Sequence, residues 1–454
     1  MNSRRSVTAS PMPIDASPPL AAERIRALEA ERQSLASILA ILRANGSATR
    51  LDIEREAHLG RAVVADRLAT LSSFGLVEEG GTGRSIGGRA PRLVRFRAEA
   101  GRLLVANLDG STIGIGLADL AGRLLIEHYE DVEPDPTGNV LVDRLEALFE
   151  WALADSRAPL WGFGLGVPGA VDFGADAELA VPRFTTFPTW NETRVVERLA
   201  LRFRAPAFVR SAVQTATLGE MTTLAPERGA QMLFVHLGTS IAAGIVADGR
   251  LLRGAQGIAG QIGHVHAGAG HLLVCGCGNV GCLQTVAGCT ALAAEGRRAA
   301  EDGRSPTLAA VLARTGVVEI ADIGTASRLG DPFSADLLAR AGQSIGTVLA
   351  SLVNLLNPAT LVVGGDLSET GDICLAAIRE GIYRHAHPLA SRDLTIARSR
   401  MGRSAGLVGA ASIVTRELFA PGFVEGWITA GTPLLHPGTI AFLSDVERLI
   451  GGDT

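Results

Sequence analysis

Residues 102–130 read RLLVANLDGSTIGIGLADLAGRLLIEHYE, and residues 232–254 repeat the same order in MLFVHLGTSIAAGIVADGRLLRG. Each stretch holds three short apolar runs joined by Gly-containing turns, which is typical of consecutive strands with hairpin connections. A helical pattern near 140–154 and a further strand at 161–171 follow the first copy. Two copies of this order predict a duplicated α/β lobe around a central cleft. Ligands of such sheets bind beyond the strand ends, between the lobes.

Length and composition agree with a protein of two or three domains. The chain has 454 residues, of which 47 % are hydrophobic and 20 % are charged, so it can bury large cores. No apolar run of about 18 residues lacks a helix breaker, and the first 30 residues hold no apolar signal segment. Five cysteines, an odd number, argue against a disulfide framework. We therefore expect a cytoplasmic protein that is neither secreted nor membrane-spanning.

The first hundred residues predict a DNA-binding domain. They carry fifteen Arg against eleven Asp and Glu, a net charge of +4, and the remainder carries −9. Helical patterns at 34–44, 50–56 and 61–74, with Ser47 as a candidate cap of the second helix, precede a hairpin whose loop spans 80–92. This is the order of a winged helix-turn-helix, although the charge alone also fits a solvated Arg-rich surface. The candidate DNA contacts lie on the third helix and in the wing: Arg61, Ala62, Ala65, Asp66, Arg84 and Arg89.

The segment CGCGNVGC at 275–282 is the most specific chemical signal in the chain. Its Gly residues let the backbone pass close to an ion. Three thiols and one imidazole fit a tetrahedral zinc site with the ligands His264, Cys275, Cys277 and Cys282. His266 and His271 are rival fourth ligands, and the alternative to a metal is unbound cysteine or a disulfide, which the CxC spacing would strain. Cys289 and Cys374 are expected to be buried as small side chains.

Together these motifs resemble the ROK family, named for repressors, open reading frames and kinases, over about residues 33–420. The resemblance is carried by GGRAPRL (87–93), FGLGVPGAVD (163–172), TWNE (189–192), LGE (218–220), DGRLLRGAQGIAGQIGH (248–264), CGCGNVGCLQT (275–285) and NLLNPATLVVGG (354–365). It implies a two-lobed, actin-like and ribonuclease-H-like fold, a structural zinc site, and dimers or tetramers. The family includes ATP-dependent sugar kinases and sugar-responsive repressors that carry a DNA-binding module.

The expected organisation combines an N-terminal winged helix-turn-helix with this two-lobed α/β fold. The predicted parts are a disordered tail at 1–30, the DNA-binding domain at 31–97, a first lobe at 101–219 to which a helix near 404–418 returns, a second lobe at 220–403 and an extension of unassigned role at 421–454.

Departures from the kinase pattern favour the repressor branch. In the family kinases an Asp shortly before LGE removes the proton from the attacking sugar hydroxyl, and Ala212 stands at that position here. Asn107 replaces the Asp of the first phosphate loop, and Ser240 replaces a Gly of the second. We therefore expect a repressor without kinase activity. The alternative is a sugar kinase with an appended DNA-binding module.

The resemblance also implies where the effector binds. Gln261 and Gln284 stand where relatives carry Glu, so with Ala212 the cleft lacks up to three negative charges. We therefore expect an atypical effector, with a sugar acid or sugar phosphate favoured over a neutral sugar, and a decayed site as the alternative. The candidate ligand contacts are Gly169, Arg210, Ser211, Gln261, His264 and Gln284. A dimeric regulator is expected to bind an inverted-repeat operator in double-stranded DNA.

Overall fold

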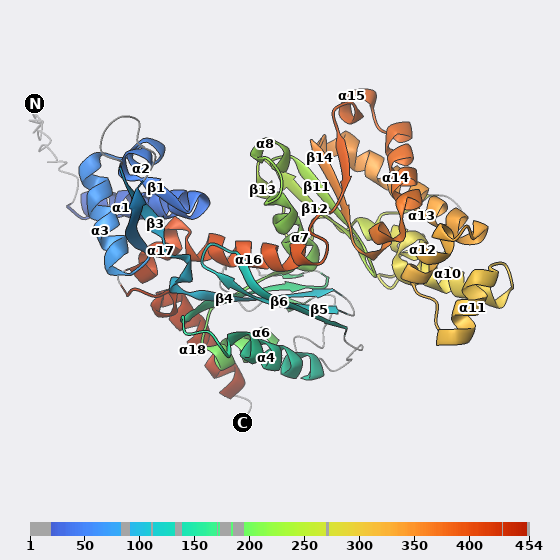
Figure 1. The fold of residues 1–454 in the computed structure, drawn as a ribbon, viewed down its shortest axis with the longest axis horizontal. Coiled ribbons are helices and arrows are strands. Elements are labelled where there is room, and N and C mark those ends of the chain that lie inside the picture. The colour runs from blue at the N-terminus through green and yellow to red at the C-terminus, as the bar shows by residue number, and fades with distance from the viewer. Residues whose placement is uncertain are drawn as a thin grey trace, which may run out of the picture. The chain divides into compact units, whose positions relative to one another are not determined.

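The computed structural model describes residues 20–82, 91–109, 112–131, 139–169, 171–172, 183–184, 195–268, 272–428 and 430–451. The chain divides into two units (Figure 1). The first contains the residues up to Phe96 and the segment Phe419–Glu425, and the second contains Arg97–Leu418 and the residues from Gly426 onward. Some sequence predictions fall outside the described residues: most of the tail, Arg84, Arg89, His271 and the TWNE motif.

The N-terminal part of the first unit has the element order of a winged helix-turn-helix. In its three-stranded sheet, β3 lies between β1 and β2 and is antiparallel to both. The second and third helices match the prediction to within one residue, whereas the first helix begins at Leu20, inside the predicted tail. The elements are α1 (Leu20–Asn45), β1 (Ser47–Thr49), α2 (Arg50–Glu56), α3 (Arg61–Ser73), β2 (Val77–Thr82) and β3 (Arg92–Phe96).

The cap of α2 differs from the prediction. Ser47 does not cap the helix, because residues 47–49 are extended and pair with β3. The cap is Thr49, whose Oγ1 accepts a hydrogen bond from the backbone N–H of Asp52 at 3.1 Å. In return, the carboxylate of Asp52 accepts from the N–H of Thr49 at 3.3 Å. This reciprocal capping box satisfies two donors at the start of the helix.

The second unit contains two five-stranded sheets with the same pairing pattern. Their strand orders are β10-β7-β4-β5-β6 and β15-β14-β11-β12-β13. In each sheet, antiparallel strands from one continuous stretch are extended by two parallel strands, so the predicted duplication of the lobe is confirmed. The strands are β4 (Arg102–Asp109), β5 (Thr112–Asp119), β6 (Leu124–Asp131), β7 (Leu160–Val167), β10 (Ala207–Ser211), β11 (Met232–Leu237), β12 (Ile241–Ala247), β13 (Arg250–Leu251), β14 (Thr360–Gly364) and β15 (Thr395–Arg398), with a separate short pair β8 (Val171–Asp172) and β9 (Arg183–Phe184).

Helices cover the sheets of the second unit (Figure 1). One face of the first sheet is packed by α4 (Asn139–Leu153), α6 (Val195–Phe203) and α18 (Pro437–Gly451). The larger core of the second lobe is formed with α9 (Leu283–Ala287), α10 (Cys289–Glu301), α11 (Pro306–Thr315), α12 (Ile320–Arg328), α13 (Pro332–Leu356) and α14 (Asp372–His385). Shorter helices are α8 (Pro226–Gly229), α15 (Pro388–Ser391), η1 (Ala98–Ala100), η2 (Ile262–His264), η3 (Asp366–Thr370) and η4 (Pro433–Leu435).

Two central helices, α7 (Ala212–Met221) and α16 (Ser404–Leu418), lie between the two sheets (Figure 1). Each begins shortly after the last parallel strand of its lobe. Their backbones approach closely: a Cβ at Gly219 of α7 would lie 2.0 Å from the carbonyl oxygen of Ala405, and a Cβ at Gly409 of α16 would lie 1.6 Å from that of Thr215. Glycine is therefore required at both crossings.

Residues that follow α16 contribute to both units. In the first unit, the ring of Phe419 packs edge-to-face against Phe96 with centroids 5.9 Å apart. In the second unit, Trp427 of α17 (Pro421–Ile428) is fully buried and packs against Trp161 at 5.2 Å. The helix α18 adds three further core residues to the first lobe: Phe442, Leu443 and Val446.

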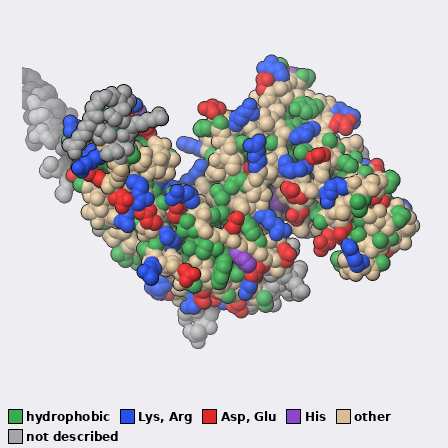
Figure 2. Space-filling model, viewed as in Figure 1, with side chains coloured by type: hydrophobic (Ala, Val, Ile, Leu, Met, Phe, Trp, Pro, Cys, Tyr) green, Lys and Arg blue, Asp and Glu red, His purple; other side chains and the backbone are tan. Residues whose placement is uncertain are grey.

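Within the described ranges, no single helix has both the length and the apolarity to cross a membrane, and only α16 and α17 counted together meet that criterion. On the face drawn in Figure 2, Arg and acidic side chains of the second unit are interspersed among apolar ones. That face therefore presents no extended surface of one charge.

Candidate functional site

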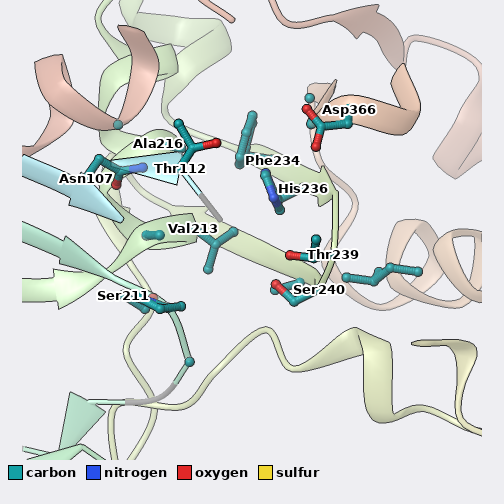
Figure 3. A pocket seen from close by; sticks show the side chains of 18 of the residues that line it. Asn107, Thr112, Ser211, Val213, Ala216, Phe234, His236, Thr239, Ser240 and Asp366 are labelled. Atoms are coloured by element: carbon teal, nitrogen blue, oxygen red, sulfur yellow. The ribbon is translucent and has the colours of Figure 1, made fainter. Parts of the chain in front are cut away.

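A cleft of about 1520 Å³ opens between the two lobes of the second unit. The first lobe supplies Asn107 from β4, and the junction of β10 with α7 supplies Ser211 and Ala212. The second lobe supplies Thr239 and Ser240 from the turn between β11 and β12, opposite Asn107 (Figure 3). The cleft thus lies at strand ends between the lobes, where the sequence pattern predicted it.

Five of the six predicted ligand contacts line this cleft: Gly169, Ser211, Gln261, His264 and Gln284. Arg210 does not, and the prediction for it is wrong. Neighbouring side chains of a strand point to opposite faces of the sheet. Because Ser211 lines the cleft, the side chain of Arg210 points away from it. The buried guanidinium donates to the carbonyl oxygen of Val209 at 2.7 Å and to the carboxylate of Glu417 at 3.2 Å. Arg210 is therefore part of a structural ion pair with α16.

At residue 212, where the family resemblance led us to expect the base of the kinases, the cleft wall carries a methyl group. Ala212 is the first residue of α7 and lines the cleft. Its neighbour Ser211 caps the helix, because its hydroxyl accepts from the N–H of Gln214 at 3.4 Å. Among the described residues that line the cleft, the carboxylates are Asp366 and Glu369, both in η3 of the second lobe. The first-lobe wall therefore offers hydrogen-bonding groups without a described carboxylate.

Asn107 lines the cleft, and its side-chain amide is held in place by neighbours. Its Oδ1 accepts a hydrogen bond from the hydroxyl of Thr215 at 2.8 Å. Two glycines make room for the amide, since a Cβ at Gly166 would lie 2.1 Å from Oδ1 and one at Gly406 would lie 2.3 Å from the amide carbon. A neutral amide in this position lacks the charge with which a carboxylate would attract a cation.

Gln284 closes the turn between β11 and β12. Its Oε1 accepts from the backbone N–H of Ile241 at 2.6 Å, and its Nε2 donates to the carbonyl oxygen of Thr239. The side chain therefore holds the loop that carries Ser240, while it also lines the cleft. An amide can do both tasks, because it offers a donor and an acceptor.

The four predicted metal ligands converge. The ligand atoms of His264, Cys275, Cys277 and Cys282 all lie within 4.8 Å of one another. Sγ of Cys277 is 3.7 Å from Sγ of Cys282, and Sγ of Cys275 is 3.6 Å from Nδ1 of His264. Zinc–sulfur and zinc–nitrogen bonds of about 2.3 and 2.0 Å would give tetrahedron edges of roughly 3.8 and 3.5 Å. The donor set and its spacing fit a tetrahedral ion.

Of the two rival ligands, His271 lies outside the described residues, and His266 is not part of this cluster. Nδ1 of His266 accepts from the N–H of Gly268 at 3.1 Å instead. Cys289 and Cys374 are buried, as predicted. Burial raises the pKa of Cys282 to about 12, whereas a hydrogen bond from the backbone of Asn279 lowers the pKa of Cys277. A metal ion would displace both protons, because thiolate is its ligand.

The helix α3 presents its predicted outward residues to solvent. Val64, Leu68 and Leu71 are buried, and the exposed positions include Arg61, Ala62, Ala65 and Asp66. The carboxylate of Asp66 pairs with Arg67 at 2.5 Å. The exposed face of the helix is therefore built largely from small side chains, with Arg61 at its N-terminal end.

Three arginines that line the cleft were missed by sequence reasoning: Arg398, Arg400 and Arg403. Arg398 ends β15 and pairs with Asp372 at 3.1 Å. The pattern Arg-Ser-Arg-Met-Gly-Arg before a helix that returns to the first lobe was visible in the sequence. Its relation to the cleft depends on how β15 joins α16, which the sequence pattern did not define.

Comparison with known proteins places these features in a family. The ROK family model matches residues 107–417. The chain is 26 % identical to the xylose repressor of Caldicellulosiruptor bescii over 379 residues, covering 82 % of this chain and 92 % of the repressor. It is 27 % identical to the glucokinase of Halalkalibacterium halodurans over 314 residues, covering 68 % of this chain and 94 % of the kinase.

A solved structure shares the fold. It is a ROK family transcriptional regulator, a homologue of the E. coli MLC protein, with a TM-score of 0.71 and 22 % identity, covering 89 % of this chain and 99 % of that one. The family model spans well over half of the sequence, and the duplicated lobes and the His-Cys cluster lie within it. The chain belongs to the ROK family.

Proposed function

We propose that this chain is a transcriptional repressor that responds to a sugar-like ligand. The observation that carries the proposal is the reach of the repressor match. The chain from Arg97 onward has 358 residues (454 − 96), so a match of 379 residues extends into the first unit. The glucokinase match covers only 68 % of the chain, which is a smaller part than the second unit alone.

The first unit is the proposed DNA-binding module. In a winged helix-turn-helix the third helix enters the major groove, and α3 presents Arg61, Ala62 and Ala65 on its exposed face. The proposed wing contacts to phosphate, Arg84 and Arg89, come from the sequence. A dimer or tetramer would place two modules on an inverted repeat, with half-sites separated by multiples of about 10–10.5 bp.

We propose zinc as the metal of the His-Cys cluster. Three thiolates and one imidazole are a common structural donor set for this ion. Cys282 is also the residue before α9, whose Gln284 holds the turn that carries Ser240, and His264 itself lines the cleft. The metal would therefore fix the shape of the ligand site without taking part in chemistry.

The helix α16 offers a route from ligand to DNA. Its first turn lines the cleft at Gly406, and its last residue is Leu418. The next residue, Phe419, packs in the first unit against Phe96 and under the guanidinium of Arg43. A ligand that prefers one position of α16 would change the DNA-binding module through this covalent connection.

The second candidate is a sugar kinase with a DNA-binding module, and the similar identity to a glucokinase favours it. The cleft opposes it. Phosphoryl transfer needs a base near the attacking hydroxyl and a carboxylate for the metal, and Ala212 and Asn107 provide neither.

The test of the proposed function is selection of bound duplexes from a random DNA library with the full chain. We expect enrichment of one inverted repeat. The variant Arg84→Ala/Arg89→Ala should bind all sequences more weakly and reduce the salt dependence of binding. Arg392→Ala is a matched control, because Arg392 is exposed and pairs only locally with Asp393. A library that is not enriched would contradict the proposal.

A further inference from the structure

The segment that joins β15 to α16 brings two arginines to the cleft. Arg400 and Arg403 line it and are exposed, and within the described part of the chain neither forms an ion pair or a hydrogen bond. Other exposed arginines of the second unit form ion pairs, as Arg340 does with Glu295 at 2.9 Å. Each of these two guanidinium groups carries a positive charge without an ion-pair partner in the described ranges, opposite a wall without a described carboxylate, while the carboxylates of the lining, Asp366 and Glu369, lie in η3 of the second lobe.

The backbone of this segment is fixed. The N–H of Ser399 donates to the carbonyl oxygen of Val363 at 2.7 Å, and its hydroxyl donates to the buried carboxylate of Glu220. The N–H of Gly402 donates to Oγ of Ser399 at 3.0 Å. The segment is therefore a tied turn that fixes the backbone from which the two arginine side chains extend, so the turn itself need not be ordered when a ligand binds.

Groups beside Arg403 complete a polar corner. The hydroxyl of Tyr129 lies 3.4 Å from Oγ of Ser404, and the carboxylate of Glu127 accepts from Ser404 at 2.8 Å. Burial raises the pKa of Tyr129 to about 12, so the phenol remains a neutral donor at physiological pH. Glu127 accepts hydrogen bonds from Ser404 and Tyr129, so it is engaged by these hydroxyl groups and forms no ion pair with Arg403.

We propose that Arg400 and Arg403 bind the phosphate group of the effector, so that the ligand is a phosphorylated sugar. Guanidinium groups match phosphate oxygens geometrically and bind them by charge-assisted hydrogen bonds. The sugar hydroxyls would meet the neutral donors and acceptors at Ser211 and Gln261. This inference rests on the proposed function, and it replaces Arg210, which is turned away from the cleft, as the source of anion preference.

The experiment is calorimetry of the metal-loaded full chain with matched probes: glucose and glucose 6-phosphate, N-acetylglucosamine and its 6-phosphate, xylose and its 5-phosphate, and ATP. At least one sugar phosphate should bind about 10- to 100-fold more tightly than its neutral partner. In Arg400→Gln/Arg403→Gln that preference should fall to about twofold or less. The control Arg392→Gln, outside the cleft, should keep the preference of the parent protein.

Several outcomes would overturn the proposal. They are equal affinity for the two members of every pair, a preference that persists in the double variant, and the failure of every sugar phosphate to bind. Binding of ATP alone, dependent on the two arginines, would assign the corner to a nucleotide instead. Thermal unfolding of the double variant and of the Arg392→Gln control checks that both are folded. The single variant Arg403→Gln should lose part of the preference for the sugar phosphate. Because DNA selection is a separate assay, a failure here leaves the proposed function standing.

Discussion

The His-Cys cluster and the corner around Ala212 and Asn107 lie in the same cleft and differ in how completely their expected functional groups are present. The cluster holds a full set of four donors within 4.8 Å of one another. In the corner, Ala212 offers only a methyl group, and the amide oxygen of Asn107 accepts a hydrogen bond from Thr215. Under the proposed function, the protein needs the donor set that shapes the ligand site and does not need the groups that would transfer a phosphoryl group.

The largest expected effect concerns the corner. With ATP and glucose, N-acetylglucosamine or xylose, turnover should stay below about 0.01 s⁻¹, against roughly 1–100 s⁻¹ for kinases. The reason is the missing base at residue 212, since loss of such a group costs about 10²- to 10⁴-fold, together with the altered Asn107. A coupled assay of ADP release, with an active sugar kinase as positive control, measures it. Turnover near 1 s⁻¹ would show that the corner around Ala212 and Asn107 still supports phosphoryl transfer, and the contrast with the complete His-Cys cluster would be lost.

The next effect concerns the cluster. The purified protein should contain about one zinc per chain, and Cys277→Ser should lose most of it, because three protein ligands remain. Elemental analysis of protein prepared without chelators checks this. Cys374→Ser is the matched control, since Cys374 is buried outside the cluster and its loss should leave the metal in place. Zinc-free parent protein would show that the complete donor set does not bind the ion.

A smaller effect is expected where the cluster meets the cleft. Gln284→Ala removes hydrogen bonds to the backbone of Ile241 and Thr239, and the free energy of unfolding should fall by about 1–3 kcal/mol. Denaturant titration measures the loss. Gln231→Ala is a suitable control, because Gln231 bonds an exposed Asp248 side chain at 2.8 Å and should cost under about 1 kcal/mol. Equal losses of unfolding free energy in the two variants would mean that Gln284 does not hold the turn between β11 and β12 against the cluster.

Sequence patterns predicted the features that depend on local spacing. The helices α2 and α3, the strand repeats and the four convergent ligands His264, Cys275, Cys277 and Cys282 all follow from such spacing. The cap at Thr49 was also readable from Thr-x-x-Asp, but the pairing of β1 with β3 that excludes Ser47 is non-local. Features fixed by tertiary packing were not predictable in this way.

The arginines illustrate that limit. Strand alternation next to Ser211 would have turned Arg210 away from the cleft, but only if the end of β10 and its facing direction were known. Arg400 and Arg403 reach the cleft because the segment before α16 is tied to β14 and α7 by Ser399. The burial of Trp427 likewise depends on contact with Trp161, far away in the sequence.

The most direct measurement of the central claim, that the cleft is a regulatory site, is the affinity for the selected operator with and without a saturating cleft ligand. Fluorescence anisotropy of a labelled duplex, at fixed salt, compares the metal-loaded chain alone with the chain saturated by the tightest-binding sugar phosphate. The account predicts that the ligand changes the operator affinity about 5- to 150-fold, the usual range for coupled sites. The same affinity in both conditions, with calorimetry confirming that the cleft is filled, would contradict it.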